Sequence, residues 1–330
     1  RYAALLHDIG HPPYSHMLED RTIFMTFHGH ESWGWKIIDD PNNDLRKALI
    51  QNIGESGISR LKDIYAGRVH PIALHEIVSS QLDVDRLDYL LRDQYHSGAD
   101  VGTYDVQRIF RSLRLDENGS LRLHPNGVPA VESYLLTRLH MYKLVYFHKL
   151  NILTSEYHRK ALRRARELAS SDRLEISDAI RGMLLSSDLD ASGYLSIDDS
   201  VVSSAISSWR DSEDQELRFW VDRILSRDSF HKRIRIPGLT SEHVEKCMIA
   251  ISAEISSAGF DPVRDLILAR VDNVGYRPYQ GGIRLVDGRD IADISSVAAA
   301  ISETVHDTMV FVPSSVRNAC EEVVKNTLNF

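Results

Sequence analysis

Three histidines and an aspartate gather around a proline turn near the start of the chain, in the sequence His7-Asp8-Ile9-Gly10-His11-Pro12-Pro13-Tyr14-Ser15-His16. His7 and Asp8 follow an apolar stretch that predicts the end of a helix, because Gly10 and the two prolines after it stop helical structure. An imidazole beside a carboxylate suits a divalent cation that keeps open positions for water. His11 and His16 bring two more imidazoles to the same corner.

A histidine at a helix end is as often a structural residue as a ligand, so the His7-Asp8 pair alone leaves both interpretations open. A second segment favours the functional one. Asp85, Tyr89 and Asp93 are spaced at i, i+4 and i+8, so a helix over this segment carries all three on one stripe.

Three other patterns in the chain have ordinary structural explanations. Asp88 and Arg92 are expected to form an exposed ion pair on another face of the same helix. A basic run is predicted to be a solvated helix face, with phosphate contact as the alternative; it comprises Arg159, Lys160, Arg163, Arg164 and Arg166. The Ser- and Asp-rich residues 183–215 lack the complete calcium-loop pattern and are interpreted as a linker.

These motifs resemble the HD-domain phosphohydrolases, and within them the deoxynucleoside triphosphate triphosphohydrolase branch that includes the sterile-alpha-motif/HD protein. The resemblance rests on the His7–His16 block, on Asp83–Asp93, and on a third block typical of the bacterial members. The third block comprises Ala130–Leu136, Arg138, His140–Tyr142 and Val145–Lys149.

The resemblance implies a metal held by four ligands. The His-Asp pair maps on His7 and Asp8, and a later aspartate maps on Asp85. The fourth ligand is an upstream histidine, which has no counterpart because the sequence begins at Arg1. The chain is therefore expected to be a fragment that begins inside the HD bundle, with its own activity uncertain. The ion is expected to be Mn, Mg, Fe, Ni or Zn.

The resemblance also assigns the other site residues. A proton for the leaving group is expected from His11, His16 or His30, with His16 and His11 favoured, and Glu19 falls close to the leaving group. The substrate-binding residues that it implies are Arg86, Tyr89, Asp93, His96, Tyr146, His148 and Lys149. Among them Arg86 and Lys149 are expected on phosphate oxygens, and Tyr89 and Asp93 at the sugar.

Composition limits the class of protein. The 330 residues carry a formal net charge of −8, which argues against nucleic-acid binding by bulk charge. The two cysteines, Cys247 and Cys320, fit a reducing compartment without structural zinc. No apolar run approaches a membrane span and no signal peptide is visible, so we expect a cytoplasmic protein.

The predicted fold is mainly α: an HD-domain helical bundle with a small β-hairpin and a C-terminal α+β region. Alternating residues on both sides of Asn118-Gly119 predict the hairpin. We expect three parts: an HD phosphohydrolase domain at 1–172, a helical extension at 173–245, and a small α+β domain at 246–330.

The expected reaction is metal-dependent hydrolysis of deoxynucleoside triphosphates (dNTPs) at the α-phosphorus, which gives nucleoside and inorganic triphosphate. The ion would lower the pKa of a bound water toward neutrality. The alternatives are an HD phosphodiesterase or nucleotide phosphatase, and a non-catalytic nucleotide-sensing module. The resemblance further implies a homo-oligomer, dimer or tetramer, and a nucleotide effector.

Overall fold

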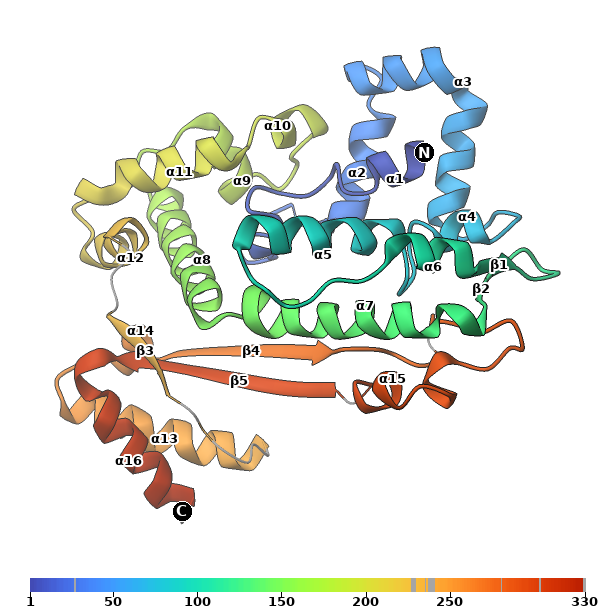
Figure 1. Ribbon diagram of the computed structural model, residues 1–330. Coiled ribbons are helices and arrows are strands. Elements are labelled where there is room, and N and C mark those ends of the chain that lie inside the picture. Colours follow the sequence, from blue (N-terminus) through green and yellow to red (C-terminus); the bar gives the residue numbers. More distant parts are fainter. Residues whose placement is uncertain are drawn as a thin grey trace.

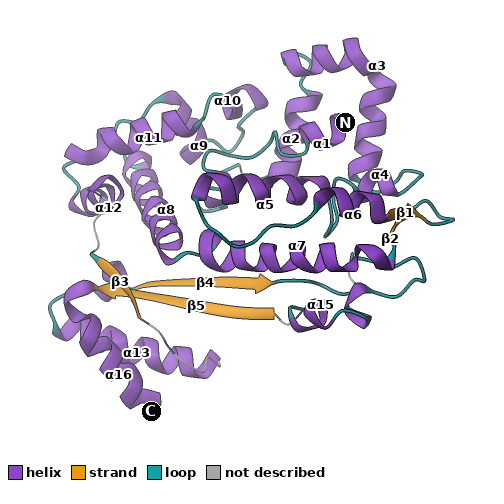
Figure 2. Cartoon of the chain, viewed as in Figure 1, coloured by secondary structure: helices purple, strands orange, loops and turns teal. Residues whose placement is uncertain are grey.

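The computed structural model describes residues 1–26, 28–226, 230–234, 236, 241–279, 281–302 and 304–328. In these residues the chain is mainly helical with two small antiparallel sheets, which confirms the predicted fold class (Figure 1, Figure 2). The α-helices are α1 (Tyr2–Leu6), α2 (His30–Asp39), α3 (Asp44–Tyr65), α4 (Ala73–Glu76), α5 (Val84–Ser97), α6 (Val106–Ser112), α7 (Val128–Met141), α8 (Lys149–Ser170), α9 (Asp178–Leu185), α10 (Ala191–Leu195), α11 (Asp199–Ser208), α12 (Gln215–Ser226), α13 (Ser241–Ser257), α14 (Pro262–Asp265), α15 (Ser296–Ala300) and α16 (Arg317–Leu328). The strands are β1 (Leu113–Leu115), β2 (Leu121–Leu123), β3 (His231–Ile234), β4 (Ile267–Val274) and β5 (Thr304–Pro313).

The short helix α1 is held in place by helices α2 and α3. Its Ala3 and Leu6 are buried in one apolar cluster with Ile38 of α2 and Leu61 of α3. The hydroxyl of Tyr65, at the end of α3, also donates a hydrogen bond to the carbonyl of Ala3. Because five residues cannot form a stable helix alone, these contacts fix the direction of α1 and of the side chains that follow it.

Helices α5 and α7 lie side by side in the middle of the molecule (Figure 1). Leu87 and Leu90 of α5 are buried in the same cluster as Tyr134 and Leu135 of α7. The Tyr134 hydroxyl donates to the carbonyl of Gln81, just before α5. With α5 held in this way, Asp85 in its first turn lies next to His7 of the N-terminal segment.

The predicted hairpin is present. Strands β1 and β2 pair antiparallel with Leu113 opposite Leu123, and the turn between them contains Gly119 at a φ of +71°. The Gly119 carbonyl accepts a hydrogen bond from the amide of Ala73, so the hairpin is tied to α4. The exposed Asp88–Arg92 ion pair of α5 is also present.

The interpretation of residues 183–215 as a linker was wrong. They contain the end of α9, all of α10 and α11, and a 3₁₀ turn at Trp209–Asp211. The aspartates mark helix starts: Asp190 caps α10 by accepting from the amide of Gly193, and Asp198 caps α11 by accepting from the amide of Val201. These helices are short and rich in serine, and each starts at an aspartate, so their composition resembled that of a loop.

The basic run on α8 is engaged with other side chains rather than simply solvated. Arg159 and Arg163 both contact the carboxylate of Asp20, and Arg164 forms a paired hydrogen bond with Asp214. Helix α8 therefore anchors the segment that precedes α2.

The C-terminal sheet has the order β3–β5–β4, with both pairs antiparallel. Val310 and Val312 of β5 pack against α13 and α16, while Phe311 faces the cluster formed with α8 and α12. The strand-like segment 282–286 forms only isolated bridges, at Arg284 and Leu285. The division at 172 and 245 stays a prediction, and β3 pairs with β5 across the second boundary. Among the described residues, no helix combines the length and apolar character needed to traverse a bilayer.

Candidate active site

His7 is oriented by a hydrogen bond to its own helix. Its Nδ1 lies 2.9 Å from the carbonyl oxygen of Ala4. A carbonyl only accepts hydrogen bonds, so Nδ1 carries a proton, and in the neutral ring Nε2 then carries the lone pair. The C-terminal end of α1 therefore presents a basic nitrogen in one fixed direction.

The His7 Nε2 atom faces two carboxylates. It lies 3.2 Å from Oδ1 of Asp8 and 3.4 Å from Oδ1 of Asp85, and it is buried without a well-directed hydrogen bond. The ligand atoms of the three residues all lie within 4.8 Å of one another. Hydrogen bonding to Asp8 and Asp85 raises the pKa of His7 to about 10 despite partial burial. The two carboxylates thus favour a positive charge at Nε2, which is either the ring proton or a cation that replaces it. One imidazole and two carboxylates are a donor set that fits a divalent cation.

Asp85 owes its place to the first turn of α5. The buried Asp83 caps this helix by accepting from the amide of Arg86 at 2.8 Å, and the Arg86 guanidinium pairs with the same carboxylate. Arg86 also donates to the carbonyl of Ser80 at 2.7 Å. Asp85 is thereby brought to His7 from 78 positions later in the sequence.

A second cluster lies beside the first and is centred on Glu19. Its Oε2 lies 2.9 Å from Nδ1 of His16, and its Oε1 lies 2.8 Å from both Nδ1 and the amide nitrogen of His30. An ionised carboxylate only accepts, so both Nδ1 atoms carry protons and the Nε2 atoms of both rings are left for a ligand. Partial burial alone would raise the pKa of Glu19, but these hydrogen bonds lower it to about 2.

His11 connects the two clusters. Its ring stacks on His30 with centroids 4.0 Å apart and meets His16 edge-on at 4.6 Å. Its Nε2 lies 3.6 Å from Oδ1 of Asp8. Burial, and secondarily the neighbouring His30, lower the pKa of His11. His11, His16, His30 and Glu19 can therefore act on a single group bound next to the His7–Asp8–Asp85 centre.

The rest of the α5 stripe meets the end of α7. The Tyr146 hydroxyl donates to Oδ2 of Asp93 at 2.7 Å, and its ring lies 6.3 Å from that of Tyr89 in a T-shaped contact. Tyr146 belongs to a π-helical turn, Tyr142–Tyr146, and such turns are frequent at functional sites. The structure thus brings Tyr146 to Tyr89 and Asp93 of the predicted stripe, and the substrate-binding roles of the three stay predictions.

Arg138 of α7 is a site residue to which sequence reasoning gave no role. Its Nε and Nη1 atoms are buried without a hydrogen-bond partner, and its guanidinium lies 5.7 Å from the ring centre of Tyr142. Partial burial raises the pKa of the Tyr89 hydroxyl, and the positive charges of Arg86 and Arg138 oppose that rise. The third sequence block contained Arg138, but only the fold shows that its charge is left unsatisfied.

Three predicted substrate residues lie at the edge of this arrangement. His96 is exposed in the last turn of α5, where its ring contacts Tyr95. His148 accepts from the amide of Leu150 and so caps α8, and Lys149 is exposed in the first turn of that helix. Their substrate-binding roles stay predictions.

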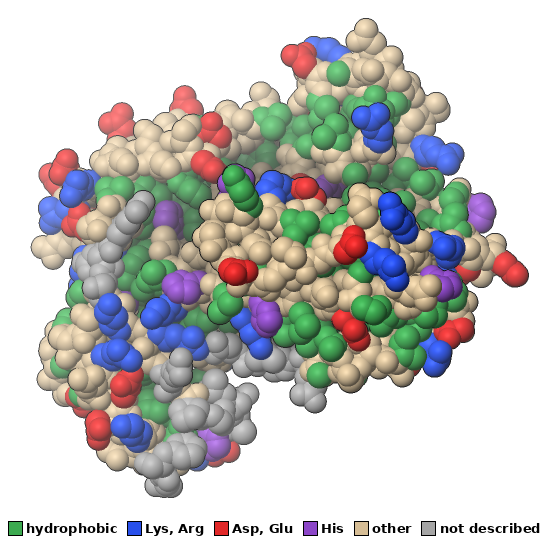
Figure 3. All heavy atoms as spheres, in the orientation of Figure 1, with side chains coloured by type: hydrophobic (Ala, Val, Ile, Leu, Met, Phe, Trp, Pro, Cys, Tyr) green, Lys and Arg blue, Asp and Glu red, His purple; other side chains and the backbone are tan. Residues whose placement is uncertain are grey.

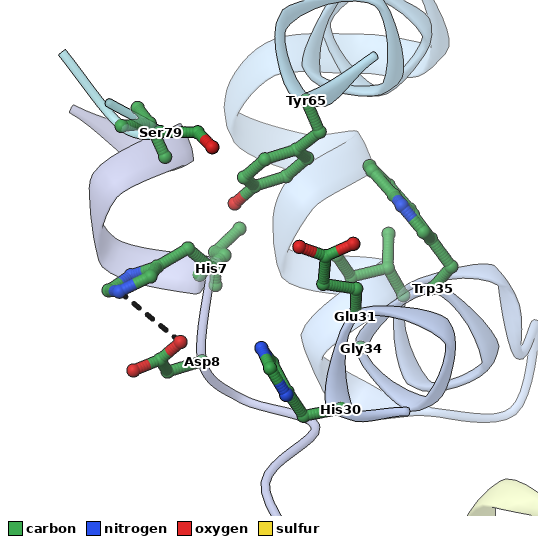
Figure 4. Close-up of a pocket in the computed structure, with 11 residues that line it drawn as sticks. His7, Asp8, His30, Glu31, Gly34, Trp35, Tyr65 and Ser79 are labelled. Carbon is green, nitrogen blue, oxygen red and sulfur yellow. Dashed lines mark ion pairs between the residues drawn. The ribbon is translucent and has the colours of Figure 1, made fainter. Parts of the chain in front are cut away.

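Beside His7 lies a cavity of about 100 Å³ (Figure 4). Figure 4 shows the Glu31 carboxylate and the Tyr65 hydroxyl on one side of it, with His7 and Asp8 on the other. On the face drawn in Figure 3, histidine, acidic and basic side chains meet above α5, in a hollow between this helix and the N-terminal elements. The site is thus open to a polar ligand.

Comparison with known proteins places these residues in a family context. Residues 1–93 match the family model of the HD domain, and residues 104–178 match that of the HD associated region. The chain is 27% identical over 281 residues to the uncharacterized protein YwfO of Bacillus subtilis, covering 85% of this chain and 62% of that protein.

Two further relatives are informative. Over 164 residues the chain is 30% identical to the deoxynucleoside triphosphate triphosphohydrolase SAMHD1 homolog of Dictyostelium discoideum, covering 46% of this chain and 30% of that protein. A crystal structure of a phosphohydrolase from Bacteroides thetaiotaomicron has the same fold, with a TM-score of 0.73 at 24% identity over 94% of this chain and 78% of that chain. The chain spans less than two thirds of the length of the Bacillus and Dictyostelium proteins.

Proposed function

The chain belongs to the HD-domain phosphohydrolase superfamily, and we propose that it hydrolyses dNTPs to deoxynucleoside and inorganic triphosphate. The observation that carries the proposal is the direct link between the two clusters, in which Asp8 contacts both His7 and His11. A cation site next to a proton-donor site is what hydrolysis of a phosphate ester with a poor leaving group requires.

His7, Asp8 and Asp85 would hold the cation, which supplies charge neutralisation at phosphate and acidifies water for attack on phosphorus. Attack at the α-phosphorus forms one bond to the water oxygen and breaks the bond to the 5′-oxygen of the deoxynucleoside. The 5′-oxygen leaves with the electron pair of that bond, so it needs a proton.

His16 is the best-placed source of this proton. Glu19 accepts a hydrogen bond from Nδ1–H of His16, so the proton that His16 can transfer lies on Nε2. The His16 side chain is 75% exposed and can reach a bound ester, whereas the lowered pKa of His11 keeps more of that ring neutral. His11 and His30 then act mainly as polar contacts for phosphate oxygens.

The remaining residues suit the two ends of a nucleotide. The unpartnered nitrogens of Arg138 supply donors for triphosphate oxygens, with Arg86 as a second positive charge nearby. The Tyr146–Asp93 hydrogen bond and Tyr89 supply an acceptor and aromatic surface for the sugar. The homo-oligomer and the nucleotide effector are further proposals carried by the family resemblance alone.

Product analysis tests the proposal directly. The protein is incubated with each dNTP and Mn²⁺ or Mg²⁺, and the products are separated by anion-exchange chromatography. We expect deoxynucleoside and inorganic triphosphate in equal amounts. Single phosphate would instead indicate a nucleotide phosphatase, and cleavage of cyclic nucleotides alone would indicate a phosphodiesterase. Tight dNTP binding without any product would indicate the nucleotide-sensing module.

The His16→Gln variant, measured in the same product assay, tests His16 as the proton donor. It removes the proton donor but retains a polar side chain, so we expect kcat to fall about 100-fold or more. His243→Gln is the matched control, because His243 is an exposed histidine of α13 and belongs to neither cluster. An active wild type with an equally active His16→Gln variant would reject His16 as the donor.

A further inference from the structure

The loop that carries the proposed proton donor has an unusual backbone. Tyr14 has a φ of +56° and a ψ of +19°, and Ser15 has a φ of +52°. Residues with a Cβ rarely adopt this left-handed conformation, because Cβ approaches the following carbonyl. Two in a row must be held by contacts from elsewhere, and His16 follows directly after them.

Those contacts come from α11, 185 residues later in the sequence. The amide of Tyr14 donates to Oδ1 of Asp199 at 2.8 Å. The Ser203 hydroxyl donates to the carbonyl of Asp199 at 2.7 Å, so in the bond between the two hydroxyls it is Tyr14 that donates to Ser203. Tyr14 is thus bound to the first turns of α11 through both its backbone and its side chain.

The start of the loop is fixed by α10. The buried Tyr194 hydroxyl donates to the carbonyl of Gly10 at 2.7 Å, and its ring stacks on Trp33 with centroids 4.0 Å apart. Helices α10 and α11 both lie after residue 178, where the match to the HD associated region ends (Figure 1). The loop between the two clusters is therefore held by a part of the chain outside both family models.

We propose that Asp199 is a positioning residue for hydrolysis: its hydrogen bond to the Tyr14 amide holds the left-handed turn and so sets where His16 presents its proton. The inference rests on the proposed function. Among the described residues Asp199 has no hydrogen bond or ion pair with either cluster, so its effect passes through the backbone of Tyr14 and Ser15. A displacement of about 1 Å at a catalytic group can lower a rate about 100-fold.

Three variants of the full chain separate this role from a general loss of structure. Asp199→Ala removes the acceptor, whereas Asp199→Asn removes the charge and keeps the Oδ1 acceptor. Asp178→Ala is the matched control, because Asp178 also follows a helix cap and, in the described part of the chain, has no hydrogen bond or ion pair with the loop. Steady-state kinetics with a dNTP gives kcat and KM, and hydrogen exchange with mass spectrometry follows the peptide at 10–17.

We expect Asp199→Ala to lower kcat about 10- to 100-fold with KM changed less than about threefold, and Asp199→Asn to stay within about threefold of wild type. Exchange in the 10–17 peptide should rise in the alanine variant alone. Unchanged kcat in Asp199→Ala, or an equal loss in Asp199→Asn, would overturn the inference. If the wild type hydrolyses no dNTP, the proposed function fails, while the exchange data still decide whether Asp199 holds the turn.

Discussion

At the scale of single residues, hydrogen-bond direction decides what each histidine offers. His7 donates Nδ1–H to a carbonyl, and His16 and His30 donate theirs to Glu19. All three therefore have Nε2 left for a ligand, and that of His7 faces the carboxylates of Asp8 and Asp85. Under the proposed function, the same type of side chain would serve as a cation ligand in one cluster and as a proton donor in the other.

Asp85→Asn should weaken cation binding. The amide is neutral, so the centre loses one of its two negative charges while its shape is kept. We expect the affinity for Mn²⁺, measured by titration calorimetry, to fall about 10- to 100-fold. Asp88→Asn on the same helix is the control, since Asp88 is exposed and pairs only with Arg92. Equal Mn²⁺ affinity in wild type and Asp85→Asn would show that Asp85 is not a ligand of the cation.

Glu19 gives a pH dependence of stability with a definite sign. Its pKa is about 2 in the folded protein against an ordinary 4.5, so it stabilises the fold above about pH 4.5 and loses this contribution as the pH falls toward 2. At neutral pH the contribution is at most about 3 kcal/mol. The loss of unfolding free energy caused by Glu19→Gln, measured by urea denaturation, should therefore be larger at pH 6.5 than at pH 3.5.

The exposed Glu31 provides the comparison for this experiment. Glu31→Gln changes the same type of side chain on the neighbouring helix α2, outside the hydrogen bonds of the histidine cluster. We expect it to change the free energy of unfolding by less than about 0.5 kcal/mol. A loss in Glu19→Gln that is the same at both pH values would show that the carboxylate is not stabilised by its histidine partners.

At the scale of elements, close packing of a turn on a helix positions the histidine cluster. A Cβ on Gly10 would lie 2.0 Å from the carbonyl oxygen of His30 and 2.3 Å from the amide nitrogen of Gly34. Both are backbone atoms of α2 and cannot move aside individually. The proline turn therefore approaches α2 this closely only because residue 10 is glycine.

Gly10→Ala should consequently push the turn away from α2. We expect a loss of about 2–4 kcal/mol of unfolding free energy, together with a fall in kcat, because His11 and His30 are carried by the two separated elements. Gly34→Ala is the matched control: its Cβ would meet Ile9 at 3.7 Å, an ordinary contact, and alanine favours the helix. Equal stability of the two variants would contradict the close approach of the proline turn to α2 at Gly10.

The elements that the sequence predicted are those with a strong local pattern. The i, i+4, i+8 stripe of Asp85, Tyr89 and Asp93 and the Asn118-Gly119 turn are readable from neighbours along the chain. Helices α10 and α11 were missed because they are short and begin at aspartates that also favour loops.

Contacts between distant segments could not be derived from local patterns. The 185-residue separation of Tyr14 and Asp199 and the unsatisfied charge of Arg138 depend on tertiary packing. The residues of the two clusters were predicted to lie close together because the family resemblance implies that these motifs share one site. The residues that hold these clusters in place have no such motif.

At the scale of the whole molecule, the C-terminal sheet shares a core with the helices that support the site. Phe311 of β5 and Ile267 of β4 belong to the same buried cluster as Leu162 of α8 and Trp220 of α12. This cluster continues to Trp33 of α2, which packs against Tyr194, the residue whose hydroxyl binds the Gly10 carbonyl. An apolar core that crosses the predicted boundaries couples the stability of the sheet to that of the site.

Phe311→Ala tests this coupling. Phe311 is 1% exposed, so its truncation should cost about 3–5 kcal/mol. Because the cluster is shared, we expect helix content by circular dichroism and tertiary packing by tryptophan fluorescence to be lost in one transition at a lower temperature. Val263→Ala removes an apolar side chain that is 85% exposed and should leave the midpoint unchanged. If residues 246–330 unfolded as an independent domain, Phe311→Ala would produce an early transition. That transition would leave the packing of α8 and α2, and the proposed dNTP hydrolysis, intact.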